Sequence, residues 1–157
     1  MSKVYVYTRN SNVEAFEKGS SRETQIKKCG SYASIKDLVV DEIVQEQCSG
    51  QLPFDRRDKA FELLKKLKTN DHIICSHLDR FCRNTLSLLQ MIQKFKKKKI
   101  YLHFVDLNCE VTGSDAIGNV FLTMLSCFSQ FTAEQTSQKI KSYKERMRTE
   151  NKFSGGK

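Results

Sequence analysis

One serine and several arginines follow apolar runs in a pattern suited to chemistry at a phosphate group. Arg9 and Ser11 lie two residues apart at the end of an alternating run, and residues i and i+2 of a strand share a face. Arg56 and Arg57 form an isolated basic pair, and residues 79–83 read D-R-F-C-R. Guanidinium groups bind phosphate oxygens and stabilise transition-state charge, and a hydroxyl placed among them can attack phosphorus. Taken singly, each residue is equally well explained as a turn residue, a helix cap or a surface charge, so the prediction depends on the combination.

The elements that must position these residues alternate between strands and helices. Alternation and apolar runs predict strands over 3–8, 35–44, 72–78 and 100–106, and helical spacing predicts helices over 21–31, 58–68, 84–97 and 119–149. Loops are expected at 10–20, 48–53 and 108–118. This order predicts an α/β fold, with a mostly parallel central sheet, flanking helices and a long C-terminal helix. Ligands of such sheets bind beyond the carboxyl ends of the strands, where the serine and arginines fall.

The composition describes a basic domain with no expected membrane span. The chain has 157 residues, with 27 Lys and Arg against 18 Asp and Glu, and its formal net charge is +9. No run of about 18 apolar residues occurs, and the first ten residues alternate instead of forming a signal-peptide core. We therefore expect a soluble, intracellular protein whose partner is a polyanion such as nucleic acid.

The six cysteines and three histidines do not indicate a metal site. They lack the C-x2-C, C-x4-C and H-x3-H spacings of zinc ligands. The cysteines are expected to be small, mostly buried hydrophobic residues without disulfides. We expect neither a metal ion nor another cofactor.

The predicted long helix changes character along its length. Its first half carries an apolar stripe from Val120 to Phe131 at helical spacing, whereas residues 139–157 hold seven basic residues against two acidic ones. A helix of about 30 residues is about 45 Å long, so the second half is expected to leave the domain. It is either a solvated tail or an arm that packs on a second subunit or lies on DNA. The run Lys96–Lys99 is interpreted as solvated surface.

Three motifs together resemble the catalytic domain of the serine recombinases, the resolvase and invertase family that also includes large serine integrases and related transposases. Residues 7–11, Y-T-R-N-S, resemble the family's Y-x-R-x-S. Ser49-Gly50, followed by Arg57 and Leu63-Leu64, resembles its S-G…R…L-L segment. Residues 78–85, L-D-R-F-C-R-N-T, resemble L-D-R-x-x-R-x-T, the most specific of the three. The resemblance runs from Val4 to about Arg148.

The resemblance implies an activity and a set of site residues. Ser11 is implied as a nucleophile that cuts and rejoins DNA through a 5′-phosphoserine link, without metal or ATP. The phosphate and its transition state are implied to be neutralised by Arg9, Arg57, Arg80 and Arg83. Asp79 is implied to orient an arginine or to handle a proton. Spacing to the leucine pair favours Arg57 over Arg56, which stays open as the alternative. Possible supporting residues are Gln25, Ser49 and Glu134.

The resemblance also implies partners and a domain organisation. Double-stranded DNA is the implied substrate, bound by a homodimer that pairs into a tetramer. Residues 1–118 are expected to be the catalytic core, 119–149 a helix for subunit contacts and DNA, and 150–157 a linker to a DNA-binding domain that follows in the family. The expected DNA-binding residues are Lys139, Lys141, Lys144, Arg146 and Arg148.

One departure from the family pattern keeps a second function open. Where the long helix of the family carries a Glu-Arg pair followed by another Glu, this chain has Thr132-Ala133-Glu134. Loss of one donor that stabilises transition-state charge typically costs about 100- to 1,000-fold in rate. The alternative is a catalytically impaired module that binds DNA and dimerises.

Overall fold

The computed structural model describes residues 2–11, 22–113 and 116–149. The chain divides into two compact units, Met1–Leu122 and Thr123–Lys157. Residues 12–20 of the expected loop over 10–20 and the expected linker over 150–157 lie outside the described residues, and Asn10 is the last residue of a strand.

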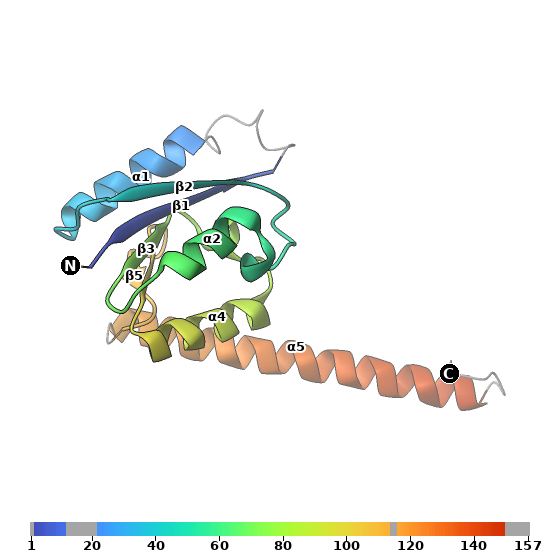
Figure 1. Ribbon diagram of the computed structural model, residues 1–157. Helices are drawn as coiled ribbons and strands as arrows, with labels where there is room; N and C mark the ends of the chain where they lie inside the picture. The colour runs from blue at the N-terminus through green and yellow to red at the C-terminus, as the bar shows by residue number, and fades with distance from the viewer. Residues whose placement is uncertain (1, 12–21, 114–115, 150–157) are drawn as a thin grey trace. The chain divides into compact units, whose positions relative to one another are not determined.

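The first unit is built on a five-stranded sheet (Figure 1). Its strands are β1 (Val4–Asn10), β2 (Glu42–Gln47), β3 (His72–Cys75), β4 (Tyr101–Phe104) and β5 (Cys109–Glu110). They lie in the order β2-β1-β3-β4-β5, and β1 to β4 are parallel while β5 pairs with β4 in the antiparallel sense. The predicted α/β class with a mostly parallel sheet is confirmed.

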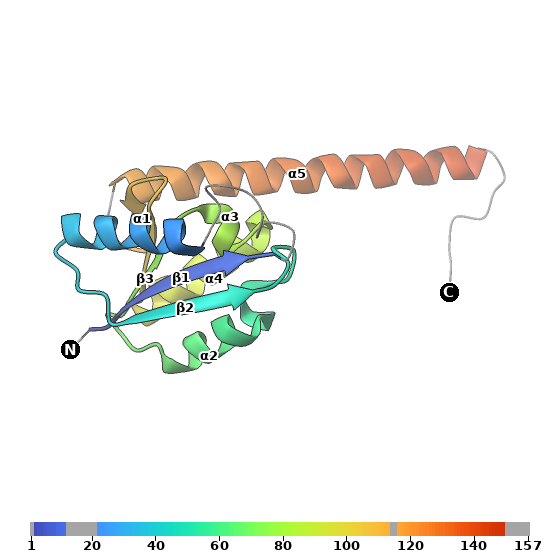
Figure 2. The same cartoon turned by 90° about the horizontal axis from the view of Figure 1, so that it is seen from above.

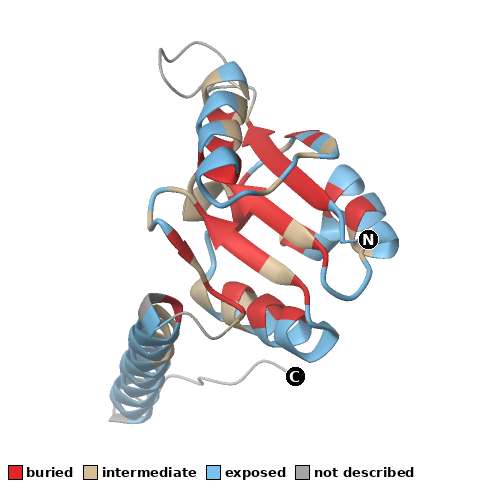
Figure 3. Cartoon of the chain, turned by 90° about the vertical axis from the view of Figure 1, so that its left-hand side faces the viewer, coloured by how far each residue is buried: buried red, intermediate tan, exposed pale blue. Residues whose placement is uncertain are grey.

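Helices cover both faces of this sheet, with α1 on one face and α2 and α4 on the other (Figures 1 and 2). Their bounds are α1 Arg22–Ile35, α2 Asp58–Lys66, α3 Leu78–Phe81 and α4 Thr85–Lys98, with a 3₁₀ turn η2 over Phe54–Arg56. Helix α4 starts where its cap predicts, because the Asn84 side chain accepts the Ser87 N–H at 2.9 Å. Parallel strands covered on both faces are buried on both faces, and Figure 3 shows most of the central strands as buried.

The two faces hold different cores. The α1 face is packed mainly with small and aliphatic side chains, namely Val4, Val6, Cys29, Ala33 and Ile74 together with Tyr32. The opposite face is aromatic: Tyr7 meets Phe54 edge-on at 4.9 Å between ring centroids, and Phe54 stacks on Phe81 at 4.1 Å. Rings extend this contact chain from Phe81 to Phe95 and Phe104. The aromatic side chains Tyr7, Phe54 and Phe81 therefore come from the same chain segments as the predicted site residues.

The predicted strand over 35–44 is wrong over residues 35–41, because β2 begins only at Glu42. Ile35 is the last residue of α1. A left-handed Asp37 (φ 54°) follows it, and the Leu38 N–H donates to the Ala33 carbonyl at 2.9 Å. Leu38 and Val40 then pack on the core of the α1 face before β2 begins. Their apolar character reflects burial outside the sheet, which periodicity cannot distinguish from a strand.

Three further boundaries differ from the prediction. The predicted strand over 72–78 ends at Cys75, and residues 78–81 form α3 instead. The predicted loop over 108–118 contains β5, whose two residues are too few to leave a periodic signal, and the first residues of α5.

Helix α5 (Ala116–Thr149) begins in the first unit and forms all of the described part of the second. Its start is tied to β5 by a close approach, because a Cβ on Gly118 would lie 2.2 Å from the Glu110 carbonyl oxygen. Large apolar side chains remain exposed on it: Val120, Met124, Phe128 and Phe131 are each more than half exposed. None of the described helices combines the length and the apolar character needed to span a membrane.

Candidate active site

The carboxyl ends of three adjacent strands bring the predicted site segments together. Strand β1 lies between β2 and β3, and all three run parallel. Arg9 and Asn10 end β1 and Ser11 follows it as a half-buried residue, while residues 48–50 follow β2 and residues 76–83 follow β3. The crevice beyond such strand ends is the usual ligand position in this class of sheet.

The end of β1 is held by Gln25 of α1. Gln25 is buried, and its amide accepts the Arg9 N–H at 3.2 Å while its own Nε2 donates to the Arg9 carbonyl at 3.2 Å and to Asn10 Oδ1 at 2.6 Å. Arg9 is fully buried and donates from Nη1 to the Cys48 carbonyl at 2.9 Å. Gln25 therefore fixes the backbone that leads into Ser11.

Arg57 is a buried brace between three segments of the site. It is 0% exposed, and its guanidinium donates from Nε to the Leu52 carbonyl at 2.9 Å and from Nη1 to the Tyr7 hydroxyl at 3.0 Å. Nη1 also donates to the Arg80 carbonyl at 3.0 Å, and Nη2 reaches the Gly50 carbonyl at 3.5 Å. The neighbouring Arg56 is exposed on the 3₁₀ turn. The bonds of Arg57 thus join β1, the segment after β2 and helix α3.

The third segment adds two more arginines and a carboxylate. Asp79 and Arg80 lie in α3, with Arg80 Nε 3.8 Å from Asp79 Oδ2. Arg83 is exposed, yet its side chain lies against Gly50: a Cβ on that glycine would be 2.7 Å from Arg83 Nε and 2.9 Å from Arg9 Nη2. We call Arg9, Arg57, Arg80 and Arg83 the arginine cluster, and Gly50 lies next to three of its members, Arg9, Arg57 and Arg83.

The remaining predicted residues are exposed. Ser49 is exposed, and its hydroxyl accepts the Gln51 N–H at 3.3 Å in the turn after β2. Ala133 and Glu134 are exposed on α5 in the second unit. The basic residues of the expected DNA-binding stretch are exposed on the same helix: Lys139, Lys141, Lys144, Arg146 and Arg148.

Two residues that sequence reasoning missed support the site. Tyr7 supplies the hydroxyl that Arg57 bonds, and burial raises the pKa of Tyr7 well above its ordinary value, so this partner stays neutral. Glu46 is buried in β2, where its carboxylate accepts the N–H groups of Lys59 at 2.9 Å and Ala60 at 3.0 Å. It therefore caps the first turn of α2, which directly follows Arg57. Glu46 lies two residues after the buried Val44 and so shares its face of β2, and this alternation is the signal that could have revealed it.

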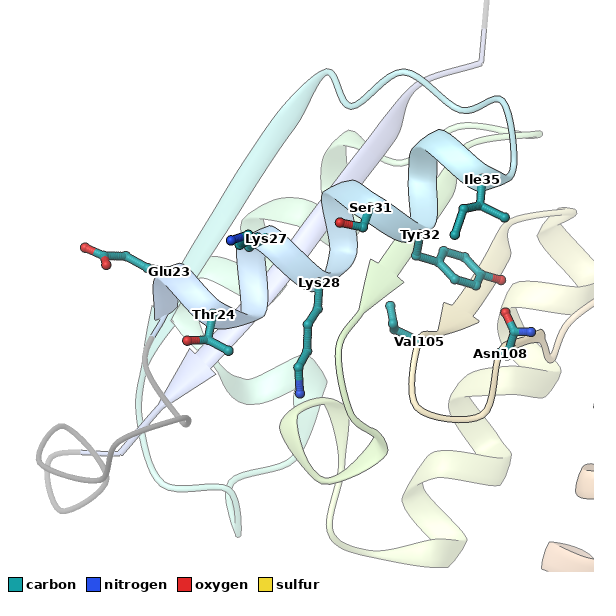
Figure 4. A pocket seen from close by; sticks show the side chains of 9 residues that line it. All are labelled: Glu23, Thr24, Lys27, Lys28, Ser31, Tyr32, Ile35, Val105 and Asn108. Carbon is teal, nitrogen blue, oxygen red and sulfur yellow. The ribbon is translucent and has the colours of Figure 1, made fainter.

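An open hollow of about 730 Å³ lies apart from the predicted site residues, between α1 and the connection from β4 to β5 (Figure 4). Lys27, Lys28 and Ile35 line it from α1, and Val105 and Asn108 line it from the other side. Among the described residues that line it, none is a predicted catalytic residue. Its size alone is therefore not a reason to place the chemistry there.

The arrangement defines a class of protein: an α/β domain that gathers fixed positive charge at the carboxyl edge of its sheet, beside the strand end that leads into Ser11. Guanidinium groups keep their charge when buried, and here one of them is satisfied by carbonyl and hydroxyl oxygens. Such a site suits a phosphate group, which accepts paired N–H donors.

Comparison with known proteins gives the family. Residues 4–153 match the family model described as the N-terminal domain of resolvase. A resolvase from Clostridium perfringens (strain 13 / Type A) is 30% identical over 112 residues, covering 67% of this chain and 58% of the relative. The Transposon Tn2501 resolvase of Escherichia coli is 24% identical over 131 residues, covering 83% of this chain and 63% of the relative. The chain thus spans about three fifths of the length of these curated relatives.

A solved structure agrees with this result. The N-terminal catalytic domain of TP901-1 integrase is 26% identical, with a TM-score of 0.72 over 85% of this chain and 98% of that domain. The chain belongs to the resolvase family of serine recombinases, and the region that it matches is the N-terminal domain.

Proposed function

We propose that this domain cuts and rejoins double-stranded DNA at specific sites, with Ser11 as the nucleophile. The Ser11 Oγ–P bond forms as the P–O3′ bond breaks, and the serine proton ends on the 3′ oxygen. The products are a 5′-phosphoserine link and a free 3′-hydroxyl. The reverse attack by a 3′-hydroxyl restores the DNA, and since the phosphoester energy is retained, neither ATP nor a metal is required.

The observation that carries the proposal is the approach of Arg9 and Arg83 to one point beside the end of β1. Both side chains lie within about 3 Å of where a Cβ of Gly50 would be. Two guanidinium groups so placed can hold the non-bridging oxygens of one phosphate and stabilise the charge that develops on them. Arg80 adds positive charge from α3, where Asp79 orients it.

Arg57 is assigned a role different from the one its motif implies. Its N–H groups are directed at Leu52, Tyr7, Arg80 and Gly50 oxygens. We assign it to hold the three segments in register and to contribute charge at longer range. Arg56, which is exposed, stays the alternative for direct phosphate contact.

The second unit is assigned to subunit and DNA contacts. Its exposed apolar stripe suits a homodimer interface, with two dimers forming a tetramer when sites pair. Its exposed lysines and arginines suit the DNA backbone, which dominates affinity without specifying sequence. The place of action is then intracellular, at the DNA. Sequence recognition is expected from elsewhere in the full-length protein.

A test of the nucleophile is covalent trapping. The protein from its full reading frame is incubated with a nicked suicide substrate made from DNA flanking its gene, and the products are separated on denaturing gels. We expect a protein–DNA adduct that Ser11→Ala abolishes. An adduct that persists in Ser11→Ala would disprove the assignment of the nucleophile.

One observation favours the second candidate, an impaired module that binds DNA and dimerises. Ala133 stands where the family carries an arginine. Under this alternative the protein binds and pairs its sites but forms no adduct, and Ala133→Arg raises trapping from an undetectable level. Adduct formation by the unmodified protein rules this alternative out.

The DNA-binding stretch is tested by charge removal with a matched control. The triple variant of Lys139, Lys141 and Lys144 to Ala is expected to weaken binding and to reduce the slope of log affinity against log salt by about one for each phosphate that is no longer neutralised. The control is the same triple change at Lys94, Lys97 and Lys98, which are exposed on α4. Equal losses of affinity in both variants would contradict a specific role for the α5 stretch.

A further inference from the structure

Gly50 occupies a position in the arginine cluster where a side chain would collide with two guanidinium-bearing side chains. A Cβ built there would lie 2.7 Å from Arg83 Nε, 3.0 Å from Arg83 Cδ and 2.9 Å from Arg9 Nη2. Cβ atoms in proteins essentially never come closer than 3.0 Å to such atoms. The Gly50 carbonyl also lies 3.5 Å from Arg57 Nη2, so three members of the arginine cluster meet this residue.

Space, not backbone conformation, is what makes glycine necessary here. The φ angle of Gly50 lies outside the left-handed region, so other residues could adopt its backbone without strain. The residue is buried. An alanine at this position would therefore leave the path of the backbone unchanged. Its methyl group would act only by displacing the neighbouring side chains.

The two arginines differ in how easily they can move. Arg9 is 0% exposed and is held by the Cys48 carbonyl at 2.9 Å, whereas Arg83 is exposed. Added bulk at Gly50 would consequently push Arg83 outward and leave Arg9 near its place. The separation between the two guanidinium groups would increase, and a single phosphate could no longer bridge them at hydrogen-bond distance.

We propose that Gly50 is a positioning residue whose missing side chain allows Arg9 and Arg83 to converge on one phosphate group. The inference rests on the proposed function for its catalytic consequence and on the guanidinium geometry for its anion-binding consequence. A displacement of about 1 Å at a reacting centre can cost about 100-fold in rate. Gly50 does not touch the reacting atoms and acts through Arg83.

The test compares Gly50→Ala with Gly30→Ala in the full chain. Gly30 lies in α1, and a Cβ there would meet nothing within 4 Å, so its alanine variant reports on a harmless glycine substitution. Affinity for inorganic phosphate is measured by titration calorimetry, and the rate of adduct formation is measured on the suicide substrate. We expect Gly50→Ala to lower phosphate affinity about tenfold and the adduct rate about 100-fold. Gly30→Ala is expected to change neither.

A double-mutant cycle with Arg83→Ala distinguishes positioning from a general structural effect. If Gly50 acts through Arg83, adding Gly50→Ala to Arg83→Ala costs less than about twofold in phosphate affinity, because the collision with Arg83 has been removed and only the approach to Arg9 Nη2 remains. The double variant also folds if Gly50→Ala alone does not, since Arg83 no longer occupies the space. An equal loss from Gly50→Ala in both backgrounds would overturn the proposal.

The two readouts separate this proposal from the proposed function. Wild-type protein that binds no phosphate, or Gly50→Ala that binds phosphate normally, overturns the role of Gly50. Wild-type protein that binds phosphate but forms no adduct overturns the recombination chemistry alone, and the phosphate affinities then still decide the role of Gly50.

Discussion

Two polar clusters with buried members lie on opposite faces of the same sheet, and their buried side chains are stabilised in different ways. The arginine cluster lies beyond the carboxyl ends of β1 to β3, where Arg57 keeps its charge and directs its N–H groups at oxygens from three segments. On the α1 face, a histidine network links the Tyr32 hydroxyl to His103 Nδ1 at 3.3 Å and His103 Nε2 to His72 Nδ1 at 2.9 Å.

The histidine network can be buried because its imidazole rings are neutral. Burial, together with the smaller effects of nearby His72 and Lys36, lowers the pKa of His103 to about 3. Burial also lowers the pKa of His72. An imidazole can lose its proton when it is buried, whereas a guanidinium cannot, so the arginine cluster needs oxygen partners. Retained charge therefore distinguishes the end of the sheet where we propose the active site.

The largest effect is expected from removing the central guanidinium. Arg57→Met leaves the Tyr7 hydroxyl and the Leu52 and Arg80 carbonyls without their donor, at a cost of about 3–4 kcal/mol in unfolding free energy. Urea denaturation at pH 7 measures it. Arg56→Met is the matched control, and its exposed side chain predicts a change within about 0.5 kcal/mol. Similar losses in the two variants would contradict the bracing role.

An intermediate effect is expected from acid at the histidine network. The unfolded chain binds a proton at His103 near pH 6.5, while the folded chain does so only near pH 3. Between these values the unfolded state holds more protons, so stability falls as pH falls, by about 2 kcal/mol from pH 7 to pH 5. The measurement is urea denaturation at both pH values. His103→Gln should remove most of this loss, and an unchanged pH dependence would show that other groups cause it.

The smallest effect is expected from removing one partner of Arg57. Tyr7→Phe keeps the aromatic contact with Phe54 but deletes the hydroxyl that accepts the Arg57 N–H, at a cost of about 1 kcal/mol. Denaturation by urea detects it. Tyr101→Phe is the matched control beside the histidine network, because the Tyr101 ring stacks on the His72 ring with 4.8 Å between the ring centroids. If Tyr7→Phe lost as much unfolding free energy as Arg57→Met, the hydrogen bond to Tyr7 alone would account for the stabilising effect of Arg57.

Local patterns predicted the class of the fold and most of the elements. The alternation of β1 and the Asn84 cap of α4 are properties of adjacent residues, and both predict elements that the structure contains. Strand β5 and the segment 38–41 were not predictable in this way. Two residues are too few to show a period, and apolar residues that pack outside a sheet look like those inside it.

The candidate site shows the same division. The D-R-F-C-R motif and the Arg9–Ser11 spacing are visible in the sequence, and their chemistry follows from residue type. The roles of Tyr7, Glu46 and Gly50 depend on contacts with residues distant along the chain. No local pattern reports such contacts.

The sequence by itself determined the alternating architecture, the basic character of α5 and which residues could act on a phosphate, because these depend on residue type and short spacing. The tertiary structure decided which arginine is a brace and which residue must lack a side chain. Arg57 finds its acceptors at Tyr7, Leu52 and Arg80, and Gly50 meets Arg9 and Arg83. These partners become neighbours only when the parallel strands align their carboxyl ends.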